Sequence, residues 1–312
     1  MSKSCQSGYR HEALFYAGDD GFMDGTLAFV RAAMEAQEPI LVVVDQRKLD
    51  ALREALNGAA SEVLFADMAE VGDNPARIIP AWQDFVERHG GSGRRVRGVG
   101  EPISTRRAAA ELAECHRHEA LLNVAFADPH FWLLCPYDTE ALDPAVIEEA
   151  RRNHPFVSED GVAAGSDRFP GAEALGVPFD APLPDPPLAT SCLLFDRGPL
   201  NGLRAFVAGH AEAAGLSRER AADLVLAANE VATNSIRHGG GFGAARIWRA
   251  DGAIVCEVAD AGRIEDPLAG RRRPRAEAIG GRGLWIANQL CELVQLRTFA
   301  TGTIVRLHMR LP

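Results

Sequence analysis

Two kinds of hydrophobic pattern alternate along residues 11–157. Short apolar runs are separated by longer segments in which apolar residues recur every three or four positions. The run Ile40–Val44 has no polar interruption, which is typical of a strand buried on both faces of a parallel sheet. The predicted strands are 13–16, 40–45, 63–66, 96–100 and 131–135, and the predicted helices are 22–36, 47–57, 76–88, 106–123 and 144–153. This alternation predicts an α/β domain with a mostly parallel sheet covered on both faces.

The pattern is lost between residues 158 and 190. Six prolines fall there among Gly, Asp and Ala, and neither a helical nor a strand period is visible. Proline removes a backbone donor and breaks both helices and central strands. We therefore predict a proline-rich linker at 158–190, between an N-terminal domain at 10–157 and a C-terminal domain at 191–312.

The C-terminal domain has a different order of elements. A predicted strand at 191–195 precedes two helices, 200–214 and 220–238, and Ser217 is placed to cap the second helix. The remaining predicted elements are strands at 244–249 and 253–260, a helix at 284–293, and strands at 294–299 and 303–311. Helices on one side of an antiparallel or mixed sheet form an α+β sandwich.

Composition and charge narrow the class of protein. The 312 residues are 47% hydrophobic and 24% charged, which is ordinary for a globular chain of about two domains. The net charge of −10 is uneven, because residues 1–190 carry 17 basic and 31 acidic residues, net −14, whereas residues 191–312 carry 16 and 12, net +4. A general nucleic-acid binder would be strongly basic, so we expect no direct nucleic-acid partner.

Other features argue against membrane, secreted and P-loop proteins. No apolar run is long enough to span a bilayer, and the polar start lacks the apolar core of a signal peptide. The six cysteines are scattered without a C-x-x-C, which favours reduced thiols and a cytoplasmic location. The only lysines, Lys3 and Lys48, follow no G-x-x-x-x-G loop, so a nucleotide site has to work without a phosphate-binding lysine.

Three short motifs of the C-terminal domain carry polar chemistry. In LVLAANEVATNSIRHG (224–239), Glu230 and Asn234 lie one helical turn apart, where a carboxylate and a carboxamide can hold hydrated Mg²⁺ and orient a nucleophile. In IVCEVADAG (254–262), Asp260 can accept a hydrogen bond from an exocyclic amine, and Gly262 lets a flat base approach the backbone. The third motif, GGRGL (280–284), exposes backbone N–H groups at a helix start, which favours anions. Each motif alone also fits a bland interpretation: an exposed polar pair, a plain turn and a loop.

The order and spacing of the three motifs resemble the nucleotide-binding boxes of the Bergerat ATPase superfamily. The pattern N-E-x-x-x-N-x-x-x-H, from Asn229 to His238, is similar to that of the anti-sigma factor serine kinases. The resemblance spans 191–312 and implies that this domain binds ATP. By it, Asn234 would ligate Mg²⁺ and Glu230 would be the general base that activates the attacking hydroxyl group.

The same resemblance assigns the rest of the nucleotide pocket. Asp260 would recognise the adenine amine with Gly262 beneath the ring, and Thr303 would help to close the adenine pocket. The residues expected at the phosphates are Gly281, Arg282 and Gly283. Family members often have a second glycine two residues after the first, where this chain has Ile264.

Two flanking features are left open by the sequence. The segment RRRPR (271–275) occupies the position of the family's mobile lid and reads equally well as a solvated loop or as a basic flap over the triphosphate. Arg237 and His238 near the helix end could contact phosphates or a partner, although a charge favoured by the helix dipole explains His238 slightly better. His210 lacks the acidic residue and proline of a phosphoacceptor motif, and the linker leaves no room for a dimerising hairpin, so this is not a conventional histidine kinase.

Five stretches of the N-terminal half, at 11–16, 100–102, 119–123, 134–138 and 153–155, resemble the signature of MEDS sensory domains. Such domains are similar in outline to the RecA/KaiC-type α/β fold without its P-loop. Ligands of parallel sheets bind at the carboxyl ends of strands. The residues expected there are Asp45, Glu101, Tyr137 and Asp138, which fit a sensory pocket or a set of structural caps equally well. His116 and His118 point to different sides of a helix, so we predict no metal site in 115–118.

Together these features favour a cytoplasmic signalling regulator. A sensory domain with an unknown small-molecule signal would control a Mg·ATP-binding domain that phosphorylates a serine or threonine on a STAS-type anti-anti-sigma protein, with a sigma factor as a further partner. Two alternatives stay open: a non-catalytic ATP-binding module that sequesters partners, and a sensor kinase with another protein substrate. Homodimerisation is implied only by the resemblance.

Overall fold

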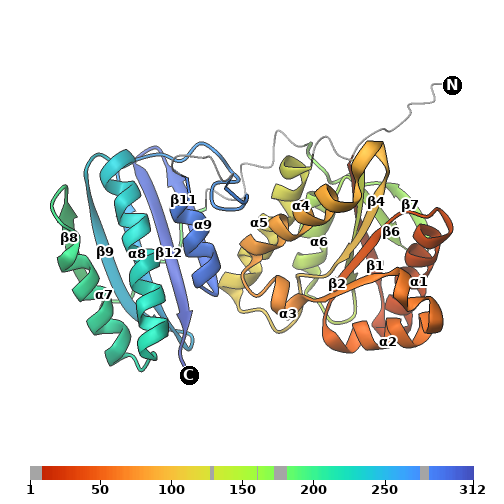
Figure 1. The fold of residues 1–312 in the computed structure, drawn as a ribbon, viewed down its shortest axis with the longest axis horizontal. Coiled ribbons are helices and arrows are strands. Elements are labelled where there is room, and N and C mark those ends of the chain that lie inside the picture. Colours follow the sequence, from red (N-terminus) through yellow and green to blue (C-terminus); the bar gives the residue numbers. More distant parts are fainter. Residues whose placement is uncertain (1–8, 127–129, 160, 172–180, 275–280) are drawn as a thin grey trace. The chain divides into compact units, whose positions relative to one another are not determined.

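The computed structural model describes residues 9–126, 130–159, 161–171, 181–274 and 281–312 (Figure 1). The chain divides into two compact units, Met1–Leu175 and Gly176–Pro312. Each unit has its own sheet and its own hydrophobic core. No helix in the part of the chain that the structure describes is both long and apolar enough to cross a bilayer.

A seven-stranded sheet organises the first unit, in the order β3-β2-β4-β5-β1-β6-β7. Its strands are β1 (Arg10–Tyr16), β2 (Ile40–Val44), β3 (Leu64–Asp67), β4 (Val96–Gly100), β5 (Phe131–Asp138), β6 (Phe156–Glu159) and β7 (Val162–Gly165). All neighbouring pairs are parallel except β6 and β7, which pair antiparallel. The prediction of an α/β unit with a mostly parallel sheet is therefore confirmed.

Helices connect these strands. They are α1 (Gly18–Glu35), α2 (Gln46–Leu56), α3 (Met68–Val71), α4 (Ile78–His89), α5 (Ala109–Ala125) and α6 (Pro144–Asn153). Because side chains alternate along a strand, β1 serves two layers. Leu14 and Tyr16 join the core that contains Phe22 of α1, whereas His11 on the other face meets His154, which follows α6.

Two strands continue the sheet into the span predicted as a linker. Residues 158–159 belong to β6 and residues 162–165 to β7, so regular structure extends beyond the expected end of the pattern. The reason is local, because the prolines begin only at Pro170 and the segment 162–165 contains no proline. The residues 172–180 of the predicted linker lie outside the described residues.

The second unit is an antiparallel sheet with helices over one face (Figure 1). The strand order is β11-β12-β10-β9-β8, with β8 (Ser191–Asp196), β9 (Phe242–Ala250), β10 (Ala253–Asp260), β11 (Leu293–Phe299) and β12 (Gly302–Arg310). The helices are α7 (Asn201–Ala213), α8 (Arg218–His238) and α9 (Gly283–Leu290). The predicted helix at 284–293 is too long at its end, because α9 stops at Leu290 and β11 begins at Leu293.

The helices bury apolar faces on the sheet. Leu224, Ala227 and Val231 of α8 pack with Ile254 and Cys256 of β10 in one core. Removing such apolar surface from water is the main stabilising term of a domain of this size. The α+β arrangement of helices on an antiparallel sheet is thereby confirmed.

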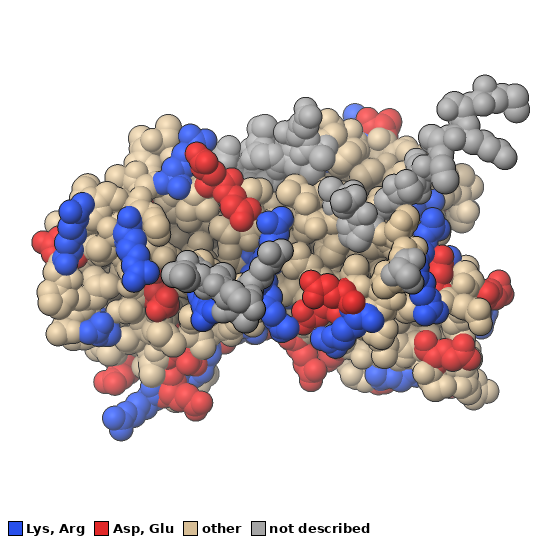
Figure 2. Space-filling view, turned by 45° about the horizontal axis from the view of Figure 1, so that its top comes forward, with Lys and Arg blue, Asp and Glu red and all other residues tan. Residues whose placement is uncertain are grey.

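The other face of the second sheet carries a buried ionic network. Glu257 of β10 is fully buried and pairs with Arg306 of β12 at 2.6 Å and with Arg246 of β9 at 2.9 Å. The Arg306 guanidinium also donates to the carbonyl of Pro184 at 2.6 Å. The end of the predicted linker is thus fastened to this sheet. On the surface that Figure 2 displays, acidic and basic side chains are interspersed.

Candidate functional site

Helix α8 fixes the position of Glu230 and Asn234. The helix begins at Arg218, and the Ser217 hydroxyl accepts the Arg220 N–H at 3.2 Å, as the sequence predicts. The apolar face of α8 enters the core, and Glu230 and Asn234 are left half-buried on one side of the helix. A carboxylate and a carboxamide are thereby held one turn apart and within reach of solvent.

The third motif lies against this pair at the start of α9. A Cβ atom on Gly283 would lie 3.0 Å from Asn234 Nδ2 and 3.2 Å from Glu230 Oε2, so a side chain at this position would crowd both polar groups. Gly281 has φ +76°, in the left-handed region that favours glycine. Arg282 is exposed between them. The first residue of the motif, Gly280, lies outside the described residues.

Asp260 sits at the end of β10, directly opposite Thr303 of β12. The Ser235 hydroxyl donates to Asp260 Oδ2 at 2.6 Å, and the Gly262 N–H donates to Oδ1 at 2.7 Å. The carboxylate is thus fixed by one contact from α8 and one from its own turn. Ser235, next to Asn234 in the first motif, is a positioning residue that the sequence analysis did not single out.

A second set of hydrogen bonds holds the turn after Asp260. The Thr303 hydroxyl donates to the Gly262 carbonyl at 2.9 Å and lies 3.1 Å from the Thr298 hydroxyl. Thr298 in turn accepts the Ile264 N–H at 3.2 Å. Gly262 is also required by packing, because a Cβ there would lie 2.7 Å from the carbonyl oxygen of His238 at the end of α8.

The three motifs therefore converge on one region of the second unit, from α8, the end of β10 and the start of α9. The donor set suits a hydrated divalent cation and a phosphate chain, because it combines a carboxylate, a carboxamide and helix-start N–H groups. A side chain in place of Gly283 would press on the polar pair, so glycine keeps the space beside Glu230 and Asn234 open.

The arginines of the segment predicted as a lid, 271–275, differ in their exposure to solvent. Arg271 is buried, whereas Arg272 and Arg273 are exposed. Arg275 lies outside the described residues, so both interpretations of this segment stay open. His238 is exposed at the carboxyl end of α8, where a helix dipole favours a positive charge.

In the first unit, the predicted sensory residue Glu101 belongs to a buried polar cluster. Lys48 Nζ donates to both Glu101 carboxylate oxygens at 2.6 Å and to the Tyr16 hydroxyl at 2.8 Å, and that hydroxyl donates to Glu101 at 2.7 Å. Burial raises the pKa of Glu101 above its usual range, and the Lys48 ammonium opposes that rise. Lys48 and Tyr16 were missed, although Lys48 is one of only two lysines in the chain.

The other three predicted sensory residues are not all in this cluster. Asp45 caps α2 by accepting the Lys48 N–H at 3.0 Å, and Asp138 accepts the Glu140 N–H at 3.0 Å. Tyr137 is fully buried, with its ring 5.5 Å from the His154 ring. The structure thus groups Asp45 with the Glu101 cluster but places Tyr137 among the side chains around His154.

A second buried polar cluster, which the sequence analysis missed, lies near Tyr137. His11, Glu119, Cys135 and His154 are almost completely buried, and each offers a potential ligand atom within 4.8 Å of the others. Burial is the main cause that lowers the pKa of His11 to about 4, so that imidazole is neutral at neutral pH. All four residues fall within stretches that carried the family resemblance, which was the signal available.

Comparisons with known proteins agree with the two-part organisation. Residues 10–155 match the model of MEDS, the methanogen/methylotroph DcmR sensory domain, and residues 196–309 match that of the histidine kinase-like ATPase domain. No curated protein matches the chain. A crystal structure of the RsbU and RsbW domains of a Mycobacterium tuberculosis protein is similar to part of it, with 22% identity and a TM-score of 0.31. That match covers 40% of this chain and 33% of the solved chain, so this chain spans about a third of the length of its structural neighbour.

Proposed function

We propose that this chain, a MEDS sensory domain followed by a histidine kinase-like ATPase domain, is a signalling regulator that transfers phosphate from ATP to a protein. The proposed acceptor is a serine or threonine on a STAS-type anti-anti-sigma protein. Once phosphorylated, that protein would no longer bind, and the regulator would be free to hold a sigma factor. The observation that carries the proposal is that a Cβ atom on Gly283 would lie within 3.0–3.2 Å of polar atoms of both Glu230 and Asn234, which brings the first and third motifs together.

In this proposal Glu230 acts as the general base. Its carboxylate accepts the proton of the acceptor hydroxyl while the hydroxyl oxygen forms a bond to the γ-phosphorus, and the bond from that phosphorus to the ADP oxygen breaks. Asn234 holds the cation through its amide oxygen. When bound, Mg²⁺ neutralises charge on the phosphate oxygens. The backbone N–H groups at the start of α9, around Gly283, bind the phosphate chain.

Asp260 orients the nucleotide in the same scheme. Its carboxylate accepts a hydrogen bond from the adenine amine, and it is already held in place by Ser235 and by the Gly262 N–H. Thr303 keeps the Gly262 carbonyl in position at the base of the adenine pocket. A recognition group that is fixed before binding loses little conformational entropy when the ligand arrives.

The test is phosphotransfer by the purified full-length chain. The chain is incubated with labelled ATP, Mg²⁺ and STAS proteins from the same genome, and label on the STAS protein is measured. Glu230→Gln should bind ATP as the unsubstituted chain does and transfer phosphate about 10²–10⁴ times more slowly, because a general base contributes a factor of this size. Asn234→Ala should weaken binding of Mg·ATP about tenfold or more.

The matched control is Glu219→Gln, which changes an exposed glutamate in the first turn of the same helix. It should leave both ATP binding and transfer unchanged. Unchanged phosphate transfer by Glu230→Gln would show that the Glu230 carboxylate is not the general base. Label on some other protein but on no STAS protein would support the kinase activity and contradict the proposed STAS substrate.

A second candidate function is favoured by Ile264. Where relatives often have a glycine, this residue packs on the core and donates its N–H to Thr298. A turn held in this way is stiffer, which suits an ATP-binding module that captures partners without turnover. Formation of a stable complex with a STAS protein in the presence of ATP, with no label transferred, would favour this module over the kinase.

A further inference from the structure

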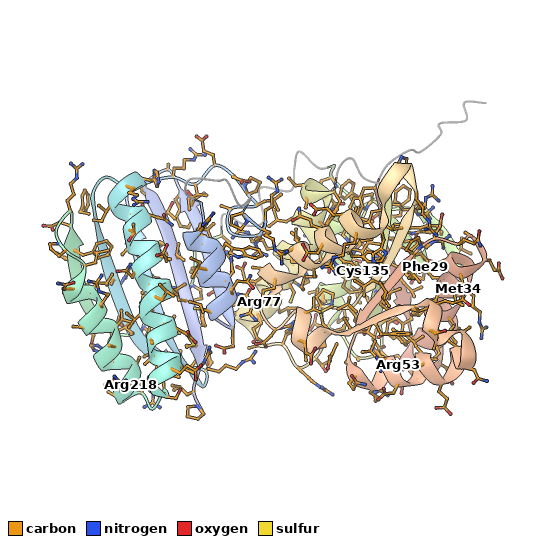
Figure 3. The ribbon with its side chains drawn as sticks, viewed as in Figure 1. Phe29, Met34, Arg53, Arg77, Cys135 and Arg218 are labelled. Carbon is orange, nitrogen blue, oxygen red and sulfur yellow. The ribbon has the colours of Figure 1, made fainter. Side chains whose placement is uncertain are left out.

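The cluster of His11, Glu119, Cys135 and His154 is the strongest unassigned feature of the molecule. The four residues come from β1, α5, β5 and the residue after α6, so the fold alone brings them together. His11, Glu119 and His154 are 0% exposed and Cys135 is 1% exposed. Figure 3 labels Cys135 within the packed side chains of the first unit.

Hydrogen bonds outside the cluster fix how both imidazoles are protonated. The Nδ1 atom of His154 lies 2.7 Å from the Ala150 carbonyl, and Nδ1 of His11 lies 3.2 Å from Asn123 Oδ1. The amide of Asn123 is itself oriented, because its Nδ2 donates to the Asn153 carbonyl at 2.8 Å. Both partners of the histidines are acceptors, so each Nδ1 carries a proton, and in the neutral imidazole each Nε2 then presents a lone pair.

These lone pairs point at one another. Glu119 Oε2 lies 3.1 Å from Nε2 of His11 and 3.3 Å from Nε2 of His154, although all three atoms are acceptors. Glu119 Oε1 is buried with no hydrogen-bond partner among the described residues. The single thiol proton of Cys135, which lies 3.4 Å from His11 Nε2, cannot serve all of these acceptors. Buried acceptors without a donor are costly, and a cation between them would satisfy all of them at once.

The distances match those of a small tetrahedral centre. Zinc binds nitrogen and oxygen at about 2.0–2.2 Å and thiolate sulfur at about 2.3 Å, which places neighbouring ligand atoms about 3.3–3.7 Å apart in a tetrahedron. The measured separations are 3.1 and 3.3 Å to Glu119, and 3.4 Å between Cys135 Sγ and His11 Nε2. All four ligand atoms lie within 4.8 Å of one another, so binding would draw the more distant ones inward around the ion.

We propose that His11, Glu119, Cys135 and His154 form a closed binding site for a divalent transition-metal ion of the zinc class. Two imidazoles, one thiolate and one carboxylate are the ligand types that zinc takes in proteins. Binding replaces the thiol proton of Cys135 by a metal–sulfur bond, and that proton is released to solvent. The outward Nδ1–H bonds of the two histidines are the usual supporting contacts of metal-bound imidazoles.

A metal ion at this site would cross-link the interior of the sensory unit. Four protein ligands fill a tetrahedral centre and leave no position for substrate, which indicates a structural ion. The ion would join two adjacent strands, β1 and β5, to α5 and to the end of α6. It therefore lies on the opposite face of β1 from the Tyr16–Lys48–Glu101 cluster and is independent of the proposed kinase.

The experiment uses the full-length chain purified without chelator. Elemental analysis should find about one equivalent of zinc per chain. After chelator treatment under mild denaturation and refolding with Co²⁺, the protein should show visible absorption of tetrahedral cobalt and a near-ultraviolet thiolate-to-cobalt band. Folded protein that holds no metal and produces neither band would overturn the proposal and leave a metal-free hydrogen-bonded cluster.

Variants separate this site from adventitious binding. Cys135→Ser should lose the thiolate band, whereas Cys256→Ser, a thiol equally buried in the second unit, should keep one equivalent of metal and both bands. If Cys135→Ser does not fold, Asn123→Ala decides, because loss of the contact to His11 should weaken metal affinity about 10–100-fold. Unchanged affinity in Asn123→Ala and an unchanged thiolate band in folded Cys135→Ser would each contradict the assignment.

Discussion

The polar groups of the two proposed sites are buried to different degrees. In the first unit, His11, Glu119 and His154 are completely enclosed and must be satisfied by one another or by an ion sealed among them. In the second unit, Glu230 and Asn234 are only half-buried on one side of a helix. Enclosed polar groups therefore govern stability, because removing one leaves its partner desolvated, whereas open polar groups remain free for a ligand that comes and goes.

The largest effect on stability should come from breaking the enclosed Lys48–Glu101 pair. The two side chains are 12% and 8% exposed, and Lys48→Met leaves the Glu101 carboxylate buried without its cation. We expect the free energy of unfolding to fall by about 3–5 kcal/mol in urea titrations. The neighbouring change Arg47→Met is the control, because the Arg47 side chain is 66% exposed and its ion pair with Asp19 should contribute less than about 1 kcal/mol.

The same variant has a predictable pH dependence. Burial raises the pKa of Glu101 and Lys48 lowers it, so the folded-state pKa rises further once Lys48 is removed. A raised carboxyl pKa means that stability is greatest below the unfolded-state value and falls as pH rises through the folded-state value. The loss of stability in Lys48→Met should be smaller near about pH 5 than near about pH 8. A loss that does not change with pH would mean that Glu101 stays ionised without its partner.

Asp260 should show intermediate behaviour, because it is held like an enclosed group but faces the nucleotide region. Asp260→Asn replaces one acceptor oxygen by a donor, so either the Gly262 contact is lost or the Ser235 contact is reversed, with the amide donating to the Ser235 hydroxyl. We expect a loss of about 1–3 kcal/mol in stability and a weakening of ATP affinity of about tenfold, measured by calorimetry. The control Asp251→Asn lies in the β9–β10 turn, where φ is +51°, and asparagine tolerates that conformation. Unchanged affinity in Asp260→Asn would exclude Asp260 from adenine recognition.

The smallest effect on stability should come from Gly283→Ala. The added Cβ would lie 3.0 Å from Asn234 Nδ2, 3.2 Å from Glu230 Oε2 and 3.3 Å from Glu230 Cβ, contacts that shifts of a few tenths of an ångström relieve, so the unfolding free energy should change by less than about 1 kcal/mol. The displaced Glu230 carboxylate should nevertheless lower kcat about tenfold, since catalysis depends on sub-ångström placement. Gly202→Ala in the first turn of α7 has open space around its Cβ and should leave both quantities unchanged. Equal kcat values for the two variants would show that Gly283 does not position the pair.

The sequence predicted the local features well, because they depend on short-range periodicity. The unbroken apolar run of β2 and the four-residue spacing of Glu230 and Asn234 each define one element without reference to the rest of the chain. The Ser217 cap is equally local. The assignment of the three motifs to one site needed the family resemblance, because periodicity does not say which loops meet.

The enclosed clusters could not be predicted in the same way. His11 contacts Glu119 across 108 positions and Cys135 across 124, and only the strand order places β1 beside β5. Close spacing in the sequence singles out Cys115–His118 as the candidate metal-binding segment, but neighbouring side chains on a helix point in different directions and cannot share one ion. Strands β6 and β7 were missed for a related reason, because β6 is fixed by pairing with β1 at the other end of the unit.

The hydrogen bond from Arg306 to the Pro184 carbonyl sets the length of the tether between the units. The other end is fixed at Ser166, whose N–H and hydroxyl bond to the Pro155 and Arg151 carbonyls, so only the 17 residues 167–183 remain between the anchors. Such a chain reaches about 56–61 Å at most, so the covalent connection alone sets this upper limit on the distance between the two anchors. Any contact between the units is therefore intramolecular, and cutting the chain between Ser166 and Pro184 would remove that limit while leaving both anchors intact.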